Sequence, residues 1–173
     1  MNIDFKAFIP NEYNDDSRVW IYQSDRAFNL EEALRIKEQL KEFSSQWHSH
    51  GDAVQNTALL LFDRFIVLLA DESQVMVSGC STDSSIKFLK GIEQEYKVHM
   101  FNRQLLAFII DEKIQTIPLD KVNNAIEKEM IDGETLYFNN TILTKKELLN
   151  HWIIPIKDSW LSGRIPQFPP IKK

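Results

Sequence analysis

Alternation of apolar and polar residues, the pattern of a pleated strand, marks several short segments of this chain. Arg18–Gln23 is rich in branched and aromatic residues and predicts the first strand. Two apolar runs, Asn56–Leu61 and Phe65–Ala70, follow across a tight turn at Asp63 and Arg64. Further strands are predicted at Val75–Ser78, Leu105–Ile110, Lys113–Pro118 and Thr135–Phe138. Short connections join most of these segments, so we expect antiparallel neighbours.

Apolar residues three or four positions apart predict helices between the strands. Asn29 with Glu32 three residues later forms a capping box, and the apolar line after it predicts a helix that ends near His48-Ser49-His50-Gly51, with Gly51 as its terminator. Two more helices are predicted. One covers Leu119–Ile131 and stops at Gly133. The last one begins with the capping pair Thr144 and Glu147, and Pro155 prevents it from continuing.

The period of the pattern changes within the stretch Val75–Lys97. Val75 and Val77 alternate with Met76 and Ser78, whereas the apolar residues from Ile86 onward have helical spacing. We expect a turn between strand and helix, with Cys80 just ahead of the helix N-terminus. Gly79 is expected to permit the turn, and the side-chain oxygens of Thr82, Asp83 and Ser84 to cap the helix.

These elements predict an α+β fold. We expect a single domain over residues 1–173, with a mainly antiparallel sheet of five to seven strands and helices packed mostly on one face. Residues 1–17 are predicted to form an N-terminal arm in which Phe5, Phe8 and Ile9 pack onto the body. Residues 156–173 are predicted to form an irregular C-terminal tail that Trp160 anchors.

Composition narrows the functional classes. The formal net charge of -5 argues against a protein that binds nucleic acid by general electrostatics. The chain has one cysteine, which excludes an internal disulfide and suits a reducing compartment. The N-terminal residues lack a basic segment followed by an apolar run, and no apolar stretch reaches the roughly 20 residues of a membrane span. We therefore predict a cytoplasmic protein without a membrane span.

The polar turn after Val77 is the candidate binding site. Free N–H groups in the first turn of a helix bind anions, and the helix dipole favours a thiolate. The candidate contacts to a small anionic ligand are Ser78, Gly79, Ser81, Thr82, Asp83 and Ser84, with Arg18 and Arg26 as further cations. The alternative is a capped helix beside a buried, unreactive cysteine, which is the commoner arrangement.

Arginine residues near strand ends and in turns could bind a carboxylate or phosphate if they converged. They are Arg18, Arg26, Arg64 and Arg103. The alternative is that each pairs with a neighbouring acid such as Asp25, Asp63 or Asp111.

Cys80 with a histidine is the candidate catalytic pair, because a thiol beside an imidazole can act as a nucleophile with its base. The candidate partners are His48 and His50, which flank Ser49 at the end of the first predicted helix. Two exposed loop histidines are the alternative. A pair separated by one residue, without a third ligand nearby, is a weak metal pattern. No metal and no cofactor are therefore predicted.

Several segments, taken in order along the chain, carry a family resemblance. They are Arg18-Val19-Trp20-Ile21-Tyr22-Gln23-Ser24 with Arg26, Trp47-His48 through His50-Gly51, Ser78-Gly79-Cys80-Ser81 with Asp83-Ser84-Ser85, Phe101 through Arg103, Phe138-Asn139-Asn140, Trp152 and Trp160. Over about residues 17–160 the chain resembles a family of small Bacteroidetes proteins commonly labelled "ABC transporter ATPase". The resemblance implies a bacterial cytoplasmic protein and assigns no catalytic residues.

The ATPase label itself lacks support in the residues. A phosphate-binding loop needs a glycine-rich turn followed by Lys and Ser or Thr. The nearest segment begins at Gly79, and it has Ser84 and Ser85 where the second glycine and the lysine belong. Asp83 adds a negative charge where phosphates would bind. We therefore do not predict ATP hydrolysis.

Two hypotheses for function remain. The preferred one is a non-enzymatic binding or interaction protein, with a homodimer as one form, because aromatic residues are numerous and no convincing catalytic set is present. The other is a small enzyme or an anionic-metabolite-binding domain with its site at the Ser78–Ser85 turn. The first predicts that Cys80 is buried and slow toward iodoacetamide, and the second predicts fast alkylation with a depressed thiol pKa.

Overall fold

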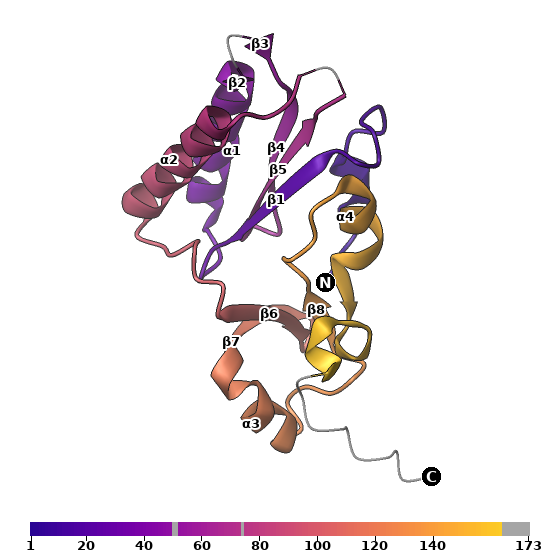
Figure 1. The fold of residues 1–173 in the computed structure, drawn as a ribbon. Coiled ribbons are helices and arrows are strands. Elements are labelled where there is room, and N and C mark those ends of the chain that lie inside the picture. Colours follow the sequence, from indigo (N-terminus) through magenta and orange to yellow (C-terminus); the bar gives the residue numbers. More distant parts are fainter. Residues whose placement is uncertain (50–51, 74, 164–173) are drawn as a thin grey trace. The chain divides into compact units, whose positions relative to one another are not determined.

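The computed structural model describes residues 1–49, 52–73 and 75–163, and for residues 48, 49, 52 and 53 it describes the backbone alone. The chain forms two compact units (Figure 1). The large unit holds residues 2–102 and 140–149, and the small unit holds residue 1, residues 103–139 and residues 150–163. Helices and antiparallel sheets occur together, so the predicted α+β class is confirmed. The strands belong mainly to two sheets of three and four strands, not to one sheet of five to seven.

The sheet of the large unit has β5 (Phe65–Asp71) at its centre. On one side β5 pairs with β1 (Arg18–Gln23), and on the other with β4 (Gln55–Leu61), both antiparallel. Every residue of β5 is buried, which explains why its first six residues, Phe65–Ala70, form an unbroken apolar run. Two short strands, β2 (His48–Ser49) and β3 (Asp52–Ala53), pair with each other.

Two helices cover one face of this sheet. The helix α1 (Leu30–Gln46) begins at the predicted capping box, and α2 (Gly79–Tyr96) packs beside it (Figure 1). Their apolar stripes meet the alternate residues of the strands that point toward them. The shared core includes Ala33, Ile36 and Leu40 from α1, Leu89, Ile92 and Tyr96 from α2, and Leu60, Ile66 and Leu68 from the sheet.

The N-terminal arm packs on the large unit, as predicted, through a different set of residues. Phe5, Ile9 and Tyr13 are buried, and the Tyr13 hydroxyl forms a hydrogen bond of 3.0 Å with Thr57 Oγ1 of β4. Phe8 closes a short 3-10 helix, η1 (Lys6–Phe8), and is 62% exposed. The prediction that Phe8 packs onto the body was therefore wrong.

The predicted strand Val75–Ser78 does not form, and the described residues of this segment are irregular. Both edges of β5 are occupied by β1 and β4, so no edge of β5 remains for a further neighbour. Val77 is buried in a cluster with Trp47 and Ala70, and Val75 packs against the same cluster. The alternation that indicated a strand therefore reflects the packing of Val75 and Val77 against this cluster, and the backbone is not a strand.

The small unit has a four-stranded antiparallel sheet. Its order is β7 (Lys113–Pro118), β6 (Leu105–Ile110), β8 (Leu136–Phe138) and β9 (Ile153–Pro155). The β6–β7 hairpin has the predicted bounds, and its two turn residues, Asp111 and Glu112, have φ of 50° and 57°. Two positive φ values match the mirror-image turns that suit the twist of a hairpin.

Three predicted boundaries are corrected. The helix expected over Leu119–Ile131 is a 3-10 turn, η2 (Leu119–Lys121), followed by the short α3 (Val122–Glu127), and left-handed Glu129 with φ of 55° ends it before Gly133. The first helix ends at Gln46 with Trp47 as its C-cap, just before the segment from His48 to Gly51 where its end was predicted, and Gly51 lies outside the described residues. The described part of the predicted irregular tail, residues 156–163, forms two 3-10 turns, η3 (Ile156–Asp158) and η4 (Trp160–Gly163), with Ile156 and Leu161 buried.

The last α-helix, α4 (Lys145–His151), has its predicted capping pair: the Glu147 N–H donates to Thr144 Oγ1, and the Thr144 N–H donates to Glu147 Oε2, both at 3.2 Å. Within the large unit, Lys145 is buried and its ammonium group donates to the carbonyls of Asn11 and Tyr13. Lys145 thereby ties the start of α4 to the N-terminal arm. Among the described residues, no helix combines the length and the apolar character that crossing a membrane requires.

Candidate functional site

Ser78 caps α2, so the helix begins earlier than predicted. Ser78 Oγ accepts a hydrogen bond from the Ser81 N–H at 3.3 Å, and Gly79 and Cys80 are already helical. The predicted caps therefore lie inside the helix, with Asp83 exposed in its second turn. A Cβ atom added at Gly79 would meet no other atom within 4 Å, so this position does not require glycine for space.

The hydroxyl groups of the first turns donate to the carbonyls of their own helix. Thr82 Oγ1 donates to the Ser78 carbonyl at 3.2 Å, and Ser84 Oγ donates to the Ser81 carbonyl at 2.7 Å. Trp47 Nε1 also donates to the Ser81 carbonyl, at 2.8 Å. These bonds hold the α2 N-terminus against the cluster around Trp47, and they use the hydroxyls that were expected to contact an anion.

Cys80 is exposed at the second position of α2. The buried cysteine that the non-enzymatic hypothesis predicted is therefore wrong, because the early start of the helix places residue 80 on its outer side. The buried side of the first turns carries Ser81 and Ser85 instead. An exposed thiol is open to reagents, and exposure alone does not provide a base for it.

The two candidate histidines can be placed only in part. His48 begins β2, which contacts α2, and its side chain is outside what the structure describes. His50 lies outside the described residues. The backbone thus brings the segment of His48 beside the helix that carries Cys80. In the part of the chain that the structure describes, no three His, Cys, Asp or Glu side chains gather closely enough to hold a metal ion.

The candidate cations Arg18 and Arg26 do not converge, because Arg18 begins β1 and Arg26 lies three residues beyond its other end. Six strand residues span about 17–20 Å. Arg18 lies over the Trp20 ring at 4.7 Å and pairs with Glu72 at 3.4 Å. Glu72 also accepts the Val77 N–H at 2.8 Å, which holds the segment before α2 in place.

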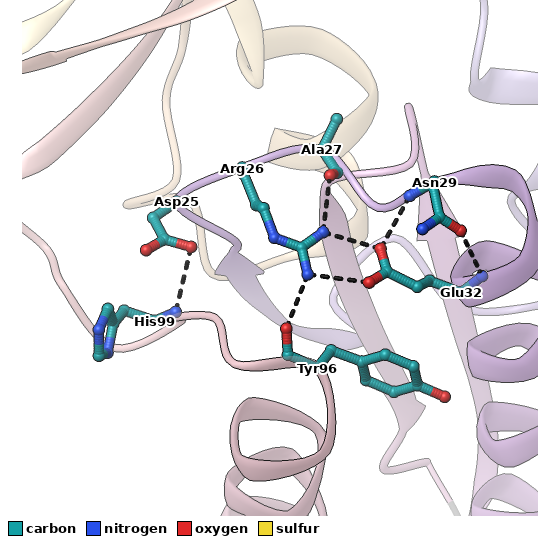
Figure 2. A network of polar contacts seen from close by, with 7 residues as sticks. All are labelled: Asp25, Arg26, Ala27, Asn29, Glu32, Tyr96 and His99. Carbon is teal, nitrogen blue, oxygen red and sulfur yellow. Dashed lines mark hydrogen bonds and ion pairs between the residues drawn. The ribbon is translucent and has the colours of Figure 1, made fainter.

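Arg26 is the centre of a polar network at the other end of β1 (Figure 2). Its guanidinium donates to both carboxylate oxygens of Glu32, at 2.7 and 2.9 Å, and to the Tyr96 carbonyl at 2.7 Å. Glu32 also accepts the Asn29 N–H at 2.9 Å. The network therefore connects the α1 N-terminus with the last residue of α2.

The charges of this network stabilise each other. The hydrogen bonds from Arg26, and then the one from the Asn29 N–H, lower the pKa of Glu32, while the bond to Glu32 raises the pKa of Arg26. A nearby carboxylate, Asp25, accepts the His99 N–H at 3.1 Å, and the His99 ring points away from Arg26 (Figure 2). Since Glu32 already holds the guanidinium in a bidentate pair, Arg26 has a structural role here.

Arg64 is 9% exposed and lies near the same end of β1. One of its terminal nitrogens donates to the carbonyls of Ser24 and Asp25, at 3.5 and 3.2 Å. Burial lowers the pKa of Arg64, and the nearby Asp25 charge opposes this effect. None of the acids proposed from the sequence is in contact with Arg18, Arg26 or Arg64 as an ion pair within the described chain. Arg103 is exposed in the small unit.

A surface that the sequence analysis missed lies along the outer edge of β4. This strand is last in its sheet, and within the described chain no strand or isolated bridge pairs with its outer side. Its seven residues, Gln55–Leu61, include no charged residue and no proline. Proteins usually protect such edges with charges, prolines or a covering segment, because unpaired N–H and C=O groups recruit further strands.

The other described edges have these protections. β1 is bridged by Thr144, and its Val19 N–H donates to the Leu143 carbonyl at 2.9 Å. β7 starts with Lys113 and ends with Pro118, and β9 has only three residues. Among the described strands, β4 therefore offers the longest unprotected edge.

One side of α1, here called the α1 flank, lies on the β4 side of the helix and away from α2. It consists of Leu30, Leu34, Lys37 and Lys41, whose spacing of four, three and four residues forms one stripe. Ser44, the next residue of the stripe, contacts β4 directly: its hydroxyl donates to Asn56 Oδ1 at 2.6 Å, and its carbonyl accepts from Asn56 Nδ2 at 3.0 Å. The opposite side of α1 faces α2, where Gln39 Nε2 donates to Glu95 at 2.8 Å.

The α1 flank is open to solvent and unpaired. Leu30 is 78% exposed and Leu34 is 56% exposed, although leucines at helical spacing are usually buried. Lys37 and Lys41 are exposed, and neither has an ion pair or hydrogen bond in the part of the chain that the structure describes. The sequence signal for this surface was present in the uncharged run Gln55–Leu61 and in the two extra leucines of α1. Which strand is an edge, however, depends on the sheet order.

No protein-family model, curated protein or solved structure matches this chain.

Proposed function

We propose that this protein is a non-enzymatic binding protein that takes up an extended segment of a partner along the outer edge of β4. The supporting observation is the edge itself, which runs for seven residues without a charge, a proline or a covering strand among the described residues. An extended peptide that joins such an edge gains backbone hydrogen bonds, and its alternate side chains then contact the surfaces beside the strand.

The alternative, a small enzyme or an anion-binding domain at Ser78–Ser85, has weaker support. The hydroxyls of Thr82 and Ser84 donate to helix carbonyls, and Arg18 and Arg26 each hold a carboxylate. A helix N-terminus with an exposed thiol is a common surface feature. It does not identify a substrate.

Hydrogen exchange tests the proposed function without altering the protein. The free protein is incubated with a pool of seven-residue peptides in which threonine alternates with varied residues, capped at both ends. Among residues 55–61, we expect the alternate amides that point away from β5 to exchange more slowly in the presence of the pool, because the added strand bonds them. A pool that leaves the exchange of residues 55–61 unchanged contradicts the proposed function.

Peptides N-methylated at alternate residues supply the matched control. A strand directs every second N–H toward one neighbour. Methylation on the edge that faces β4 is therefore expected to abolish binding, whereas methylation on the opposite edge leaves it intact. Equal loss from both sets would indicate binding by another mode.

A further inference from the structure

The charges beside the β4 edge indicate what kind of segment it takes up. The α1 flank contributes two ammonium groups, from Lys37 and Lys41, and neither forms an ion pair among the described residues. The edge strand itself is neutral. A segment added to β4 would thus meet positive charge from the helix without a compensating negative charge from the strand.

The direction of α1 relative to β4 fixes where each type of side chain lies. The start of α1 is held beside the turn that follows the end of β4, because the Phe28 N–H donates to the Asp63 carbonyl at 2.7 Å. The end of α1 is held at the beginning of β4 through Ser44 and Asn56. The helix therefore runs antiparallel to the strand, with the two leucines near Leu61 and the two lysines toward Gln55.

The spacing of the flank matches the period of a strand. Four helix residues advance about 6 Å, which is close to the advance of two strand residues. Successive residues that face α1 from an added strand would thus lie near Leu30, Leu34, Lys37 and Lys41 in turn. The first two positions favour apolar side chains and the last two favour acidic ones.

We propose that the occupant of the β4 edge is an acidic extended peptide of a partner protein, with two apolar residues and two acidic residues at every second position. This inference rests on the proposed function and specifies its partner. Two apolar side chains bury Leu30 and Leu34, and two carboxylates pair with Lys37 and Lys41.

The same lysines disfavour a second copy of this chain as the occupant. In a symmetric dimer the β4 strands of two copies would pair antiparallel around a two-fold axis at Ala58. The middle of α1 in each copy would then lie near this axis, so Lys37 of one copy would approach Lys41 of the other. Like charges in that position oppose pairing, and lysine beside an edge is a known means of preventing self-association.

Synthetic peptides test the charge preference directly. The probe is the capped peptide Val-Thr-Val-Thr-Glu-Thr-Glu, and its counterpart carries Lys in place of Glu. Both are also made in reverse order, because an added strand can run in either direction. Calorimetric titration is expected to give about tenfold tighter binding for the glutamate peptide.

The variant Lys37→Glu with Lys41→Glu is expected to reverse this preference. The matched control is Lys87→Glu with Lys90→Glu, two exposed lysines of α2 that are equally without partners in the described chain, and it should leave the preference unchanged. Circular dichroism of both variants checks that they fold. A preference that the first variant does not alter overturns the assignment to the α1 flank.

The outcomes separate this inference from the proposed function. Equal or tighter binding of the lysine peptide at residues 55–61 overturns the inference that the partner segment is acidic, and leaves the proposed function unaffected. A dimer in gel filtration with light scattering that the peptide pool dissociates makes a second copy the occupant and also overturns the acidic partner. If neither the added peptides nor dimer formation slows amide hydrogen exchange at residues 55–61, the proposed function itself fails.

Discussion

A hydroxyl near a helix N-terminus can contact a ligand or bond to the helix itself. In α2 the hydroxyls of Thr82, Ser84 and Ser85 donate to carbonyls three or four residues earlier. Short polar side chains reach these carbonyls without strain, so this use competes with binding in any serine-rich first turn. A cluster of small polar residues therefore indicates a helix start more securely than it indicates a site.

Cys80 alkylation is the first prediction at the residue scale. The thiol is exposed, so we expect iodoacetamide to modify it completely in the native state. Mass spectrometry over time measures the rate, and the protein in denaturant is the reference. The Cys80→Ser variant should differ from the wild type by less than about 0.5 kcal/mol in free energy of unfolding. Modification only after unfolding would show that the thiol is buried.

At the scale of the element, α1 shows how local chemistry and distant contacts combine. Its capping box, Asn29 with Glu32, depends on residues three apart and is readable from the sequence. Arg26 joins this box from six residues before Glu32, whereas the Tyr96 carbonyl joins it only because the end of α2 lies next to the start of α1. The box therefore contributes to helix initiation and to the docking of the two helices.

The Glu32→Gln variant tests the contribution of this network. We expect the free energy of unfolding at pH 7 to fall by about 1 kcal/mol, since charge-assisted bonds become neutral ones in a partly solvated site. The pKa of Glu32 is lowered in the folded state, so its contribution is complete above its unfolded pKa of about 4.3 and disappears as the pH falls through the folded value. Chemical denaturation at pH 7 and pH 3 measures the difference.

Glu31→Gln is the matched control for that variant. Glu31 lies next to Glu32 and pairs with Arg35 at 2.7 Å, yet both side chains are mostly exposed. Such a pair contributes about 0.3–0.5 kcal/mol. Equal losses in the two variants would contradict a special role for the Arg26 network.

At the scale of the whole molecule, both units bury tyrosines. Burial raises the pKa of Tyr13 and Tyr96 in the large unit, and raises that of Tyr137 in the small unit to about 12. The Tyr137 hydroxyl also accepts a hydrogen bond from Trp160 Nε1 at 3.1 Å, which opposes the increase. Both units therefore resist ionisation of tyrosine in the folded state.

We expect the protein to lose stability at alkaline pH. A group whose folded-state pKa is raised stabilises fully below its unfolded pKa, which is about 10 for tyrosine, and that stability disappears as the pH rises toward the folded value. Tyr137 should account for about 1–3 kcal/mol between pH 10 and pH 12. Denaturation at pH 9 and pH 11 is compared between the wild type and Tyr137→Phe. An equal loss in both proteins would contradict this contribution.

Features set by neighbours in the sequence were predictable from the chain. The strand Arg18–Gln23, the hairpin of Leu105–Ile110 with Lys113–Pro118, and the capping boxes at Asn29 and Thr144 have the expected positions. Each depends on the periodicity of apolar side chains, on the residues of a turn, or on hydrogen bonds between residues three positions apart. The α+β class follows from the same local signals.

Features set by residues far apart along the chain were decided only by the tertiary structure. Local alternation at Val75–Ser78 could not reveal that β1 and β4 already occupy both sides of β5. The sequence likewise contained the neutral run Gln55–Leu61 and the exposed Leu30 and Leu34, yet an edge exists only relative to its sheet. Backbone hydrogen bonding between strands is non-local, so the order of the strands, and with it the surface open to a partner, was fixed by packing of the whole unit.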